Sequence, residues 1–373
     1  MVVGEWDNTQ VLPDNSESNI IVSSPPNQYL RWEKTTNWNG GLDVAVLGNR
    51  IAFTADVYRR VSDDLIGMRS LPGENGFDYS TMNWAKLTNR GYELSLSTVN
   101  VKTKDFRWVM DFNLAHNKSK INRLNVRDNS YEPSREGYSV GAVFSLKTAG
   151  LDENGLQMFY NKQGEKVSFN DFFGLEYGYM MGGLIPFLKS NLSAEEYRNL
   201  FTYEGTTEPK FTGGWINRFY YKNFDLTVSA SFVLDQTVQE QPFYNPVQTS
   251  PGQNYSRRMS QIWSPDNTSG NYPRIMGTYT EGEENWAYQW LGMLDPGNSY
   301  RKYDYWFKKM SYMRINSIRL GYTFPERLLG HIGFSSARIS FEARNPFVFG
   351  SSYKGYFDPE TYGNIYTQPL AKT

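Results

Sequence analysis

The feature that most constrains this chain is a strict alternation of apolar and polar side chains that recurs along its length. In the first clear example, Ile51, Phe53 and Val57 fall on one side of the backbone, and Asp56 and Arg60 fall on the other. A two-residue period is that of a β-strand, so the pattern predicts strands with one apolar and one charged face. What covers the apolar face is therefore the question that decides the fold.

The alternation predicts four antiparallel hairpins. They are 37–46 with 50–61, 91–97 with 108–114, 213–220 with 224–234, and 312–324 with 338–344. With a last strand at 366–373, this makes about nine strands in an all-β chain. Gly48-Asn49 in the first turn supplies residues that tolerate positive φ.

The connections fall into two classes. Short turns are predicted at Gly48, 100–105, 221–223 and 325–335, and long loops at 62–85, 121–209, 235–300 and 346–365. If all short turns lie at one end of the sheet, each long loop lies at the other, and 121–209 is one excursion outside the wall of strands. Within it, 142–146 resembles a strand and 193–200 resembles a capped helix.

Composition removes several classes of function. The net charge of −1 does not indicate binding to nucleic acid, and the absence of cysteine excludes disulfides and thiolate metal sites. The longest apolar run, 179–188, is too short for a membrane helix, and the N-terminus does not resemble a signal peptide.

We predict no enzyme, no cofactor and no metal site. The adjacent carboxylates Asp63-Asp64, Glu195-Glu196 and Glu283-Glu284 point to opposite sides of an extended chain, so we interpret them as solvated loop charges. The two histidines, His116 and His331, lie near strand ends. The stretch beginning at Asp152 resembles only the start of a calcium loop.

Alternation alone does not separate a soluble β-sandwich from a membrane β-barrel, because both pair an apolar with a polar face. The loop asymmetry and the 16% aromatic content favour the barrel. For a barrel, the residues expected to point to lipid are Ile51, Phe53, Leu94, Leu96, Phe112, Val228, Leu320 and Phe341. Those expected to point inward are Asp56, Glu93, Asp111, Asp225, Arg319 and Glu342.

Seven short motifs resemble SusC-like TonB-dependent outer-membrane transporters, in family order. They are PNQYLRWEKT at 26–35, NGGLD at 39–43, NRI at 49–51, NRGYEL at 89–94, PKFTGG at 209–214, YMRINSIRLGYTFP at 312–325 and FDPE at 357–360. Departures from the family concentrate in 121–209 and 235–300, the segments expected to face cargo and partner.

The resemblance implies an antiparallel transmembrane β-barrel segment. Residues 1–373 would be the C-terminal part of a larger barrel of around 22 strands. The chain shows no TonB-contacting motif, plug domain or first barrel strands, so we expect these parts of the transporter outside it. The implied location is the outer membrane of a Gram-negative bacterium.

The implied function is active import of oligosaccharides or oligopeptides. A SusD-like surface lipoprotein would dock on the extracellular loops, and TonB would deliver energy through the plug domain. The alternative left open is a soluble or surface-exposed all-β glycan-binding module.

Candidate substrate-binding residues come in two groups. Trp286, Tyr288, Trp290, Tyr305 and Trp306 crowd one predicted outer loop, where aromatic faces stack on sugars or line apolar pockets; an interfacial girdle and packing within the loop would use the same residues. Arg60, Arg314 and Arg319 would face the lumen, where they either tune selectivity or form salt bridges to Glu93 or Asp111.

Overall fold

The fold is known from a computed structural model. It describes residues 4–7, 19–22, 25–71, 74, 76–77, 79–124, 132–180, 185–246, 252–275, 299–329, 334–350 and 358–361.

Eight long strands form one antiparallel sheet in the order β17-β16-β15-β14-β6-β5-β4-β3. The strands are β3 (Lys34–Val46), β4 (Ile51–Ser70), β5 (Tyr79–Lys102), β6 (Phe106–Leu124), β14 (Phe211–Tyr221), β15 (Phe224–Gln239), β16 (Phe307–Thr323) and β17 (Arg338–Phe349). Each strand is hydrogen-bonded to neighbours as in the wall of an up-and-down barrel, and the wall is open at β3 and β17 within the described residues. The predicted all-β, partial-barrel fold is confirmed, while the ninth predicted strand, at 366–373, lies outside the described residues.

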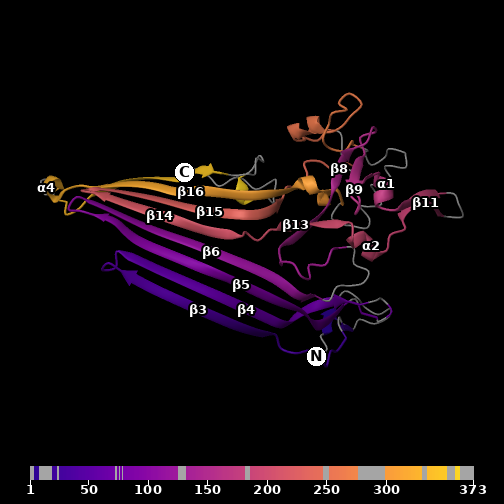
Figure 1. The fold of residues 1–373 in the computed structure, drawn as a ribbon, viewed down its shortest axis with the longest axis horizontal. Helices are drawn as coiled ribbons and strands as arrows, with labels where there is room; N and C mark the ends of the chain where they lie inside the picture. Colours follow the sequence, from indigo (N-terminus) through magenta and orange to yellow (C-terminus); the bar gives the residue numbers. More distant parts are fainter. Residues whose placement is uncertain are drawn as a thin grey trace.

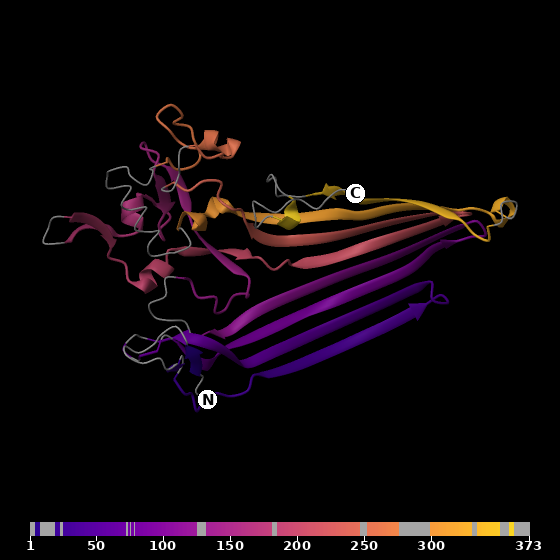
Figure 2. The same ribbon diagram turned by 180° about the vertical axis from the view of Figure 1, so that it is seen from behind.

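The short connections gather at one end of the sheet and the small loop elements at the other (Figures 1 and 2). The β3–β4 turn places Leu47, Gly48 and Asn49 at φ values of 56°, 62° and 63°, the left-handed region predicted from Gly48-Asn49. The connection from β16 to β17 carries the short helix α4 (Glu326–Leu329). We call the short-turn end the turn end and the opposite end the loop end.

The register confirms the predicted assignment of the two faces. Partners across a sheet share a face, and Phe53 pairs with Leu96, which pairs with Phe112. On the other face Asp56 pairs with Glu93. The same register joins the remaining predicted residues into two sets on opposite faces. We call these the apolar face (Ile51, Phe53, Leu94, Leu96, Phe112, Val228, Leu320 and Phe341) and the polar face (Asp56, Glu93, Asp111, Asp225, Arg319 and Glu342).

Large side chains of the apolar face are uncovered in this chain. Phe341 is 71% exposed, Ile339 63% and Val57 59%. A sandwich would bury such residues under a second sheet. Aromatic pairs lie on this face near the turn end, including Trp108 with Phe219 and Phe224 with Tyr322. This arrangement is typical of a lipid-facing surface with an interfacial girdle.

The predicted strand ends at the loop end were wrong. Strand β4 continues to Ser70 and β5 starts at Tyr79, so most of the predicted loop 62–85 is a two-stranded extension. Similarly, β15 continues to Gln239, β16 begins at Phe307, and β17 continues to Phe349. The register shifts at each of these places, which breaks the alternation without ending the strand.

Residues between β6 and β14 form an excursion, as predicted, because β6 pairs directly with β14. Its strands are β7 (Ala142–Leu146), β8 (Thr148–Leu151), β9 (Gln157–Tyr160), β10 (Lys166–Val167), β11 (Leu175–Met180), β12 (Ile185–Ser190) and β13 (Phe201–Thr206). The predicted strand 142–146 pairs with β13 and stays out of the wall. The predicted helix is α2 (Ala194–Arg198), whose N-cap Ser193 and Glu196 form a capping box.

The remaining elements are short. They are the hairpin β1 (Gly4–Asp7) and β2 (Asn19–Val22), the helix α1 (Phe169–Phe172), and 3-10 turns at Arg257–Gln261, Ser299–Lys302, Asp304–Trp306 and Pro359–Thr361. Among the described residues, the helices are all too short or too polar to traverse a bilayer.

Candidate functional site: the polar face and the loop end

Ion pairs cross the polar face from strand to strand. The Arg218 guanidinium on β14 pairs with Asp111 on β6, and the Ser97 hydroxyl donates to the same carboxylate. Arg338 on β17 reaches Asp225 on β15 at 2.6 Å, across the intervening strand β16. These two acids and two bases are therefore paired in place, as a water-facing lumen allows.

Glycines make two polar contacts across this face possible, one ion pair and one hydrogen bond. A Cβ built on Gly321 would lie 2.5 Å from Arg338 Nη2 and 2.6 Å from Asp225 Oδ1. A Cβ on Gly91 would lie 2.6 Å from the Tyr58 hydroxyl, which donates to Asn117 Oδ1 at 3.0 Å. A side chain at either glycine would displace the polar contact above it.

The three predicted arginines all lie on the polar face, but in different surroundings. Arg60 is exposed and its Nε donates to Asn37 Oδ1 at 2.9 Å. Arg319 is also exposed and lies opposite Glu342 in register. Neither contact is the predicted salt bridge to Glu93 or Asp111.

Arg314 is buried, with 3% of its side chain exposed. Its guanidinium pairs with the Asp358 carboxylate, and its Nε lies 2.9 Å from Glu360 Oε1. The Glu360 carboxylate also lies 3.5 Å from the Tyr312 hydroxyl. These contacts hold the 358–361 turn against the polar face, and they join the FDPE motif at 357–360 to the motif at 312–325.

The loop end contains an aromatic core. Phe159, Phe173, Tyr303 and Trp306 are fully buried in it, and Phe159 stacks on Phe172 with ring centroids 4.4 Å apart. Of the predicted aromatic binding residues, Trp306 is one of these core residues and Tyr305 is partly buried against them. Trp286, Tyr288 and Trp290 lie outside the described residues.

An arginine is inserted among these rings. The Arg258 guanidinium lies 4.5 Å from the centre of the Phe243 ring and pairs with the Glu240 carboxylate. Burial opposes its charge, but the Glu240 carboxylate and the hydrogen bond to Tyr272 together raise the pKa of Arg258. The side chain therefore stays cationic and ties the 3-10 turn Arg257–Gln261 to the aromatic core.

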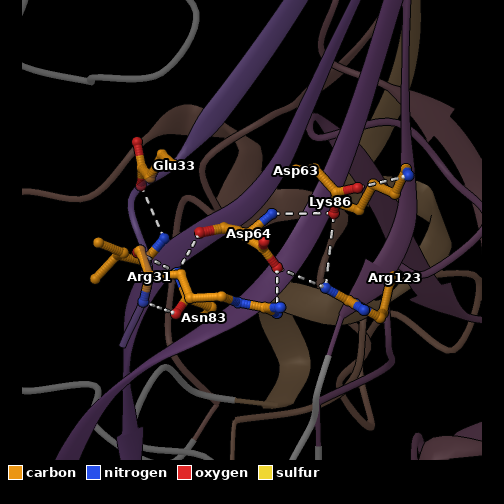
Figure 3. A network of polar contacts seen from close by, with 8 residues as sticks. Arg31, Glu33, Asp63, Asp64, Asn83, Lys86 and Arg123 are labelled. Carbon is orange, nitrogen blue, oxygen red and sulfur yellow. Dashed lines mark hydrogen bonds and ion pairs between the residues drawn. The ribbon is translucent and has the colours of Figure 1, made fainter. Parts of the chain in front are cut away.

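A second polar network ties the segment before β3 to the wall (Figure 3). Arg31 pairs with Asp64 at 2.9 Å, and Lys86 pairs with Asp63 at 2.8 Å. Arg123 lies 3.6 Å from Asp64 and 3.7 Å from Asp63, between the two carboxylates. The prediction that this acidic pair is a solvated loop charge was wrong: both acids lie on β4, and Asp64 is buried.

The other acidic candidates serve local structure. The Asp152 carboxylate accepts the backbone N–H groups of Asn154 and Leu156 at 2.9 and 2.8 Å, which is a turn and not a calcium loop. Glu196 caps α2. Glu283-Glu284 and His331 fall outside the described residues, and His116 Nδ1 lies 2.6 Å from the Lys210 carbonyl oxygen. In the part of the chain that the structure describes, His, Asp and Glu residues form no group of three suited to a metal ion.

Comparison with known proteins agrees with this geometry. A family model described as "TonB dependent receptor-like, beta-barrel" matches residues 6–178. The chain is 27% identical over 368 residues to TonB-dependent receptor P3 of Formosa agariphila, covering 94% of this chain and 33% of that receptor. It is also 27% identical over 355 residues to TonB-dependent receptor SusC of Bacteroides thetaiotaomicron, covering 93% of this chain and 31% of SusC. The chain thus spans about a third of the length of these relatives.

A solved structure of the RagAB peptide transporter has the same fold, with a TM-score of 0.67 at 20% identity. The match covers 95% of this chain and 35% of that one. The resemblance to TonB-dependent receptors indicated by the seven motifs is therefore confirmed, and so is the β-barrel fold.

Proposed function

Because this chain forms part of a TonB-dependent receptor-like β-barrel and resembles SusC, we propose that the protein containing it imports nutrients across the outer membrane of a Gram-negative bacterium. The observation that carries the proposal is the two-faced wall. Its apolar face carries large exposed side chains such as Phe341, Ile339 and Val57, and its polar face holds paired charges suited to a wet lumen. A soluble glycan-binding module, the alternative fold, would leave that apolar face in water.

The cargo we propose is an oligosaccharide or an oligopeptide. RagAB, whose solved structure shares this fold, is a peptide transporter, and SusC is a second relative. On the polar face, Arg60 and Arg319 are exposed and can meet polar cargo. For Arg314, Tyr305 and Trp306, burial favours a supporting role in which they hold the cargo-facing surfaces in place. Trp286, Tyr288 and Trp290 remain our proposed aromatic contacts.

We further propose that 1–373 is the C-terminal part of the barrel and that the plug domain and TonB contact lie elsewhere in the full protein. A SusD-like lipoprotein would cover the loop end. In support, the loop end carries its own buried aromatic core, which would hold a docking surface in one conformation before the partner binds.

The test uses the full-length transporter expressed in a host lacking it. Uptake of labelled oligosaccharides and oligopeptides is measured with the wild type, with Arg60→Gln plus Arg319→Gln, and with Lys102→Gln plus Arg107→Gln at the turn end as the matched control. We expect TonB-dependent uptake of one cargo class, reduced about tenfold or more by the first pair only. No uptake of either class by the inserted wild type would refute the import proposal.

The partner is tested separately. Replacing 276–298 by a short flexible linker spares β15, β16 and the described core, and it removes Trp286, Tyr288 and Trp290. We expect loss of co-purification with the lipoprotein encoded beside the transporter while the barrel stays inserted. Unchanged co-purification for this and for a replacement of 161–165 would remove the support for loop-end docking.

A further inference from the structure

Four cations lie side by side on the apolar face at the loop end. Arg59 on β4 is the register partner of Arg90 on β5, which is the partner of Lys118 on β6. Lys120 follows two residues along β6 and shares the face. All four side chains are exposed. We call these residues the cation row.

The cation row faces outward, because the next row on the same face is Val57, Tyr92 and His116. The ring of His116 lies 5.2 Å from the rings of both Tyr92 and Phe211, and the exposed Trp38 is the register partner of Arg59. Tyr92, His116 and Phe211 form an aromatic belt directly below the cations, and Trp38 lies level with Arg59. Aromatic belts mark the border between hydrocarbon and headgroups.

The depth of the row agrees with that border. A tilted membrane strand needs about 9–11 residues to cross the hydrocarbon. From Ile51, the first residue of β4, to Arg59 is about nine residues, so Arg59 lies where the hydrocarbon ends. There an outward charge costs far less than it does at the midplane of the bilayer.

The row differs from the cations of the polar face in its partners. Within the described residues, none of the four forms an ion pair, whereas Arg218 and Arg338 are each paired with an acid. Like charges directly opposite each other in a sheet repel and destabilise it. An anion bound between them removes that cost.

The space for an anion is present. A cavity of about 1080 Å³ opens where β6 and β14 diverge, and all four cations line it. The three acids in its lining already have partners: Glu208 accepts from the Ser119 hydroxyl at 2.7 and 2.9 Å, Glu204 lies 2.5 Å from Lys147 Nζ, and Asp235 lies 4.0 Å from Lys210 Nζ. The cation row therefore dominates the charge of the outer side of this cavity.

We propose that the cation row binds the phosphate groups of the outer-leaflet glycolipid, so that one lipid A headgroup docks in the fork between β6 and β14. The proposal rests on the outer-membrane location in the proposed function. Guanidinium and ammonium groups at headgroup depth pair with phosphate oxygens, and arginines do so in a bidentate manner. The acyl chains of such a lipid would lie along the apolar face below the aromatic belt.

The test uses the full-length transporter purified in detergent, and native mass spectrometry to count bound lipid. The probes are bis-phosphorylated lipid A, the same lipid with its phosphates removed, and inorganic phosphate. The variant is Arg59→Gln, Arg90→Gln, Lys118→Gln. The matched control is Lys102→Gln, Lys104→Gln, Arg107→Gln, three exposed cations at the turn end.

We expect the wild type and the control to bind bis-phosphorylated lipid A. The variant, and the wild type with dephosphorylated lipid, should bind at least about tenfold more weakly. Equal binding by wild type and variant would overturn the proposal, as would full competition by inorganic phosphate at the lipid's concentration, which would indicate a free-phosphate site instead.

Two further measurements distinguish a loss of lipid binding from a loss of folding and from a loss of transport. Arg59→Lys with Arg90→Lys keeps the charge and should keep both the lipid and the heat-resistant folded barrel, so loss of lipid from this variant in its folded form would overturn the proposal. Cargo uptake is assayed in parallel. A wild type that binds lipid A without importing cargo would refute the proposed import alone.

Discussion

The wall and the loop end use the same large side chains for opposite environments. In the wall, Phe341 is 71% exposed on the apolar face, whereas Phe159 at the loop end is fully buried among other rings. The wall therefore depends on a surrounding apolar phase for its stability, while the loop end carries a core of its own in water. Phenylalanine content alone does not distinguish the two, but its spacing does: period two in the wall, clusters such as Phe169, Phe172 and Phe173 at the loop end.

The largest expected effect tests the loop-end core. Phe159→Ala removes a ring that stacks on Phe172 and contacts Tyr303 edge-on at 5.2 Å, so we expect a loss of about 3–5 kcal/mol in the local stability of the loop end. Hydrogen exchange of β8 and β9 in the full-length protein measures it. The neighbouring Tyr160→Ala, at an exposed position, is the control and should change little. Equal effects of the two substitutions would argue against a packed core.

The next effect tests the wall. Leu96→Arg places a charge on the apolar face midway between the aromatic belt at Tyr92 and the girdle at Trp108, and we expect a cost of about 2–4 kcal/mol to the inserted barrel. The adjacent Ser95→Arg puts the same charge on the polar face and should be tolerated. Urea unfolding in lipid vesicles compares the two. Greater harm from Ser95→Arg would reverse our assignment of the faces.

The sequence could predict the wall because its alternation is a local signal. The prediction of strand ends failed at positions where one residue breaks the two-residue period. Asp64 and Asp235 take φ values of 55° and 54° at the bulges of β4 and β15, and Asn345 takes 50° near the shift between β16 and β17. Beyond each bulge the strand continues with its pattern displaced, so the prediction ended there.

The polar contacts could not be predicted, because their partners are remote in sequence. Arg218 and Asp111 are 107 residues apart, and Arg338 and Asp225 are 113 apart. Only the register of strands brings them together. The aromatic core at the loop end likewise joins α1, β9 and the 3-10 turn Asp304–Trp306, which no periodicity relates. Conversely, the α2 capping box was predictable because its two residues lie within one turn.

The smallest expected effect concerns that capping box, in the exposed part of the loop end. Backbone and side-chain hydrogen bonds from Ser193 lower the pKa of Glu196. A carboxylate with a lowered folded-state pKa contributes stability above its unfolded pKa, and that contribution is lost as the pH falls through the folded value. Ser193→Ala removes the side-chain donor and should raise the pKa of Glu196 toward its usual range. Helix α2 would then be less stable at neutral pH, and its stability would depend less on acid.

NMR titration of the glutamate side chains measures the shift at Glu196, with Glu195 on the same helix as the internal control. An unchanged pKa of Glu196 would show that the Ser193 hydroxyl does not stabilise the Glu196 carboxylate.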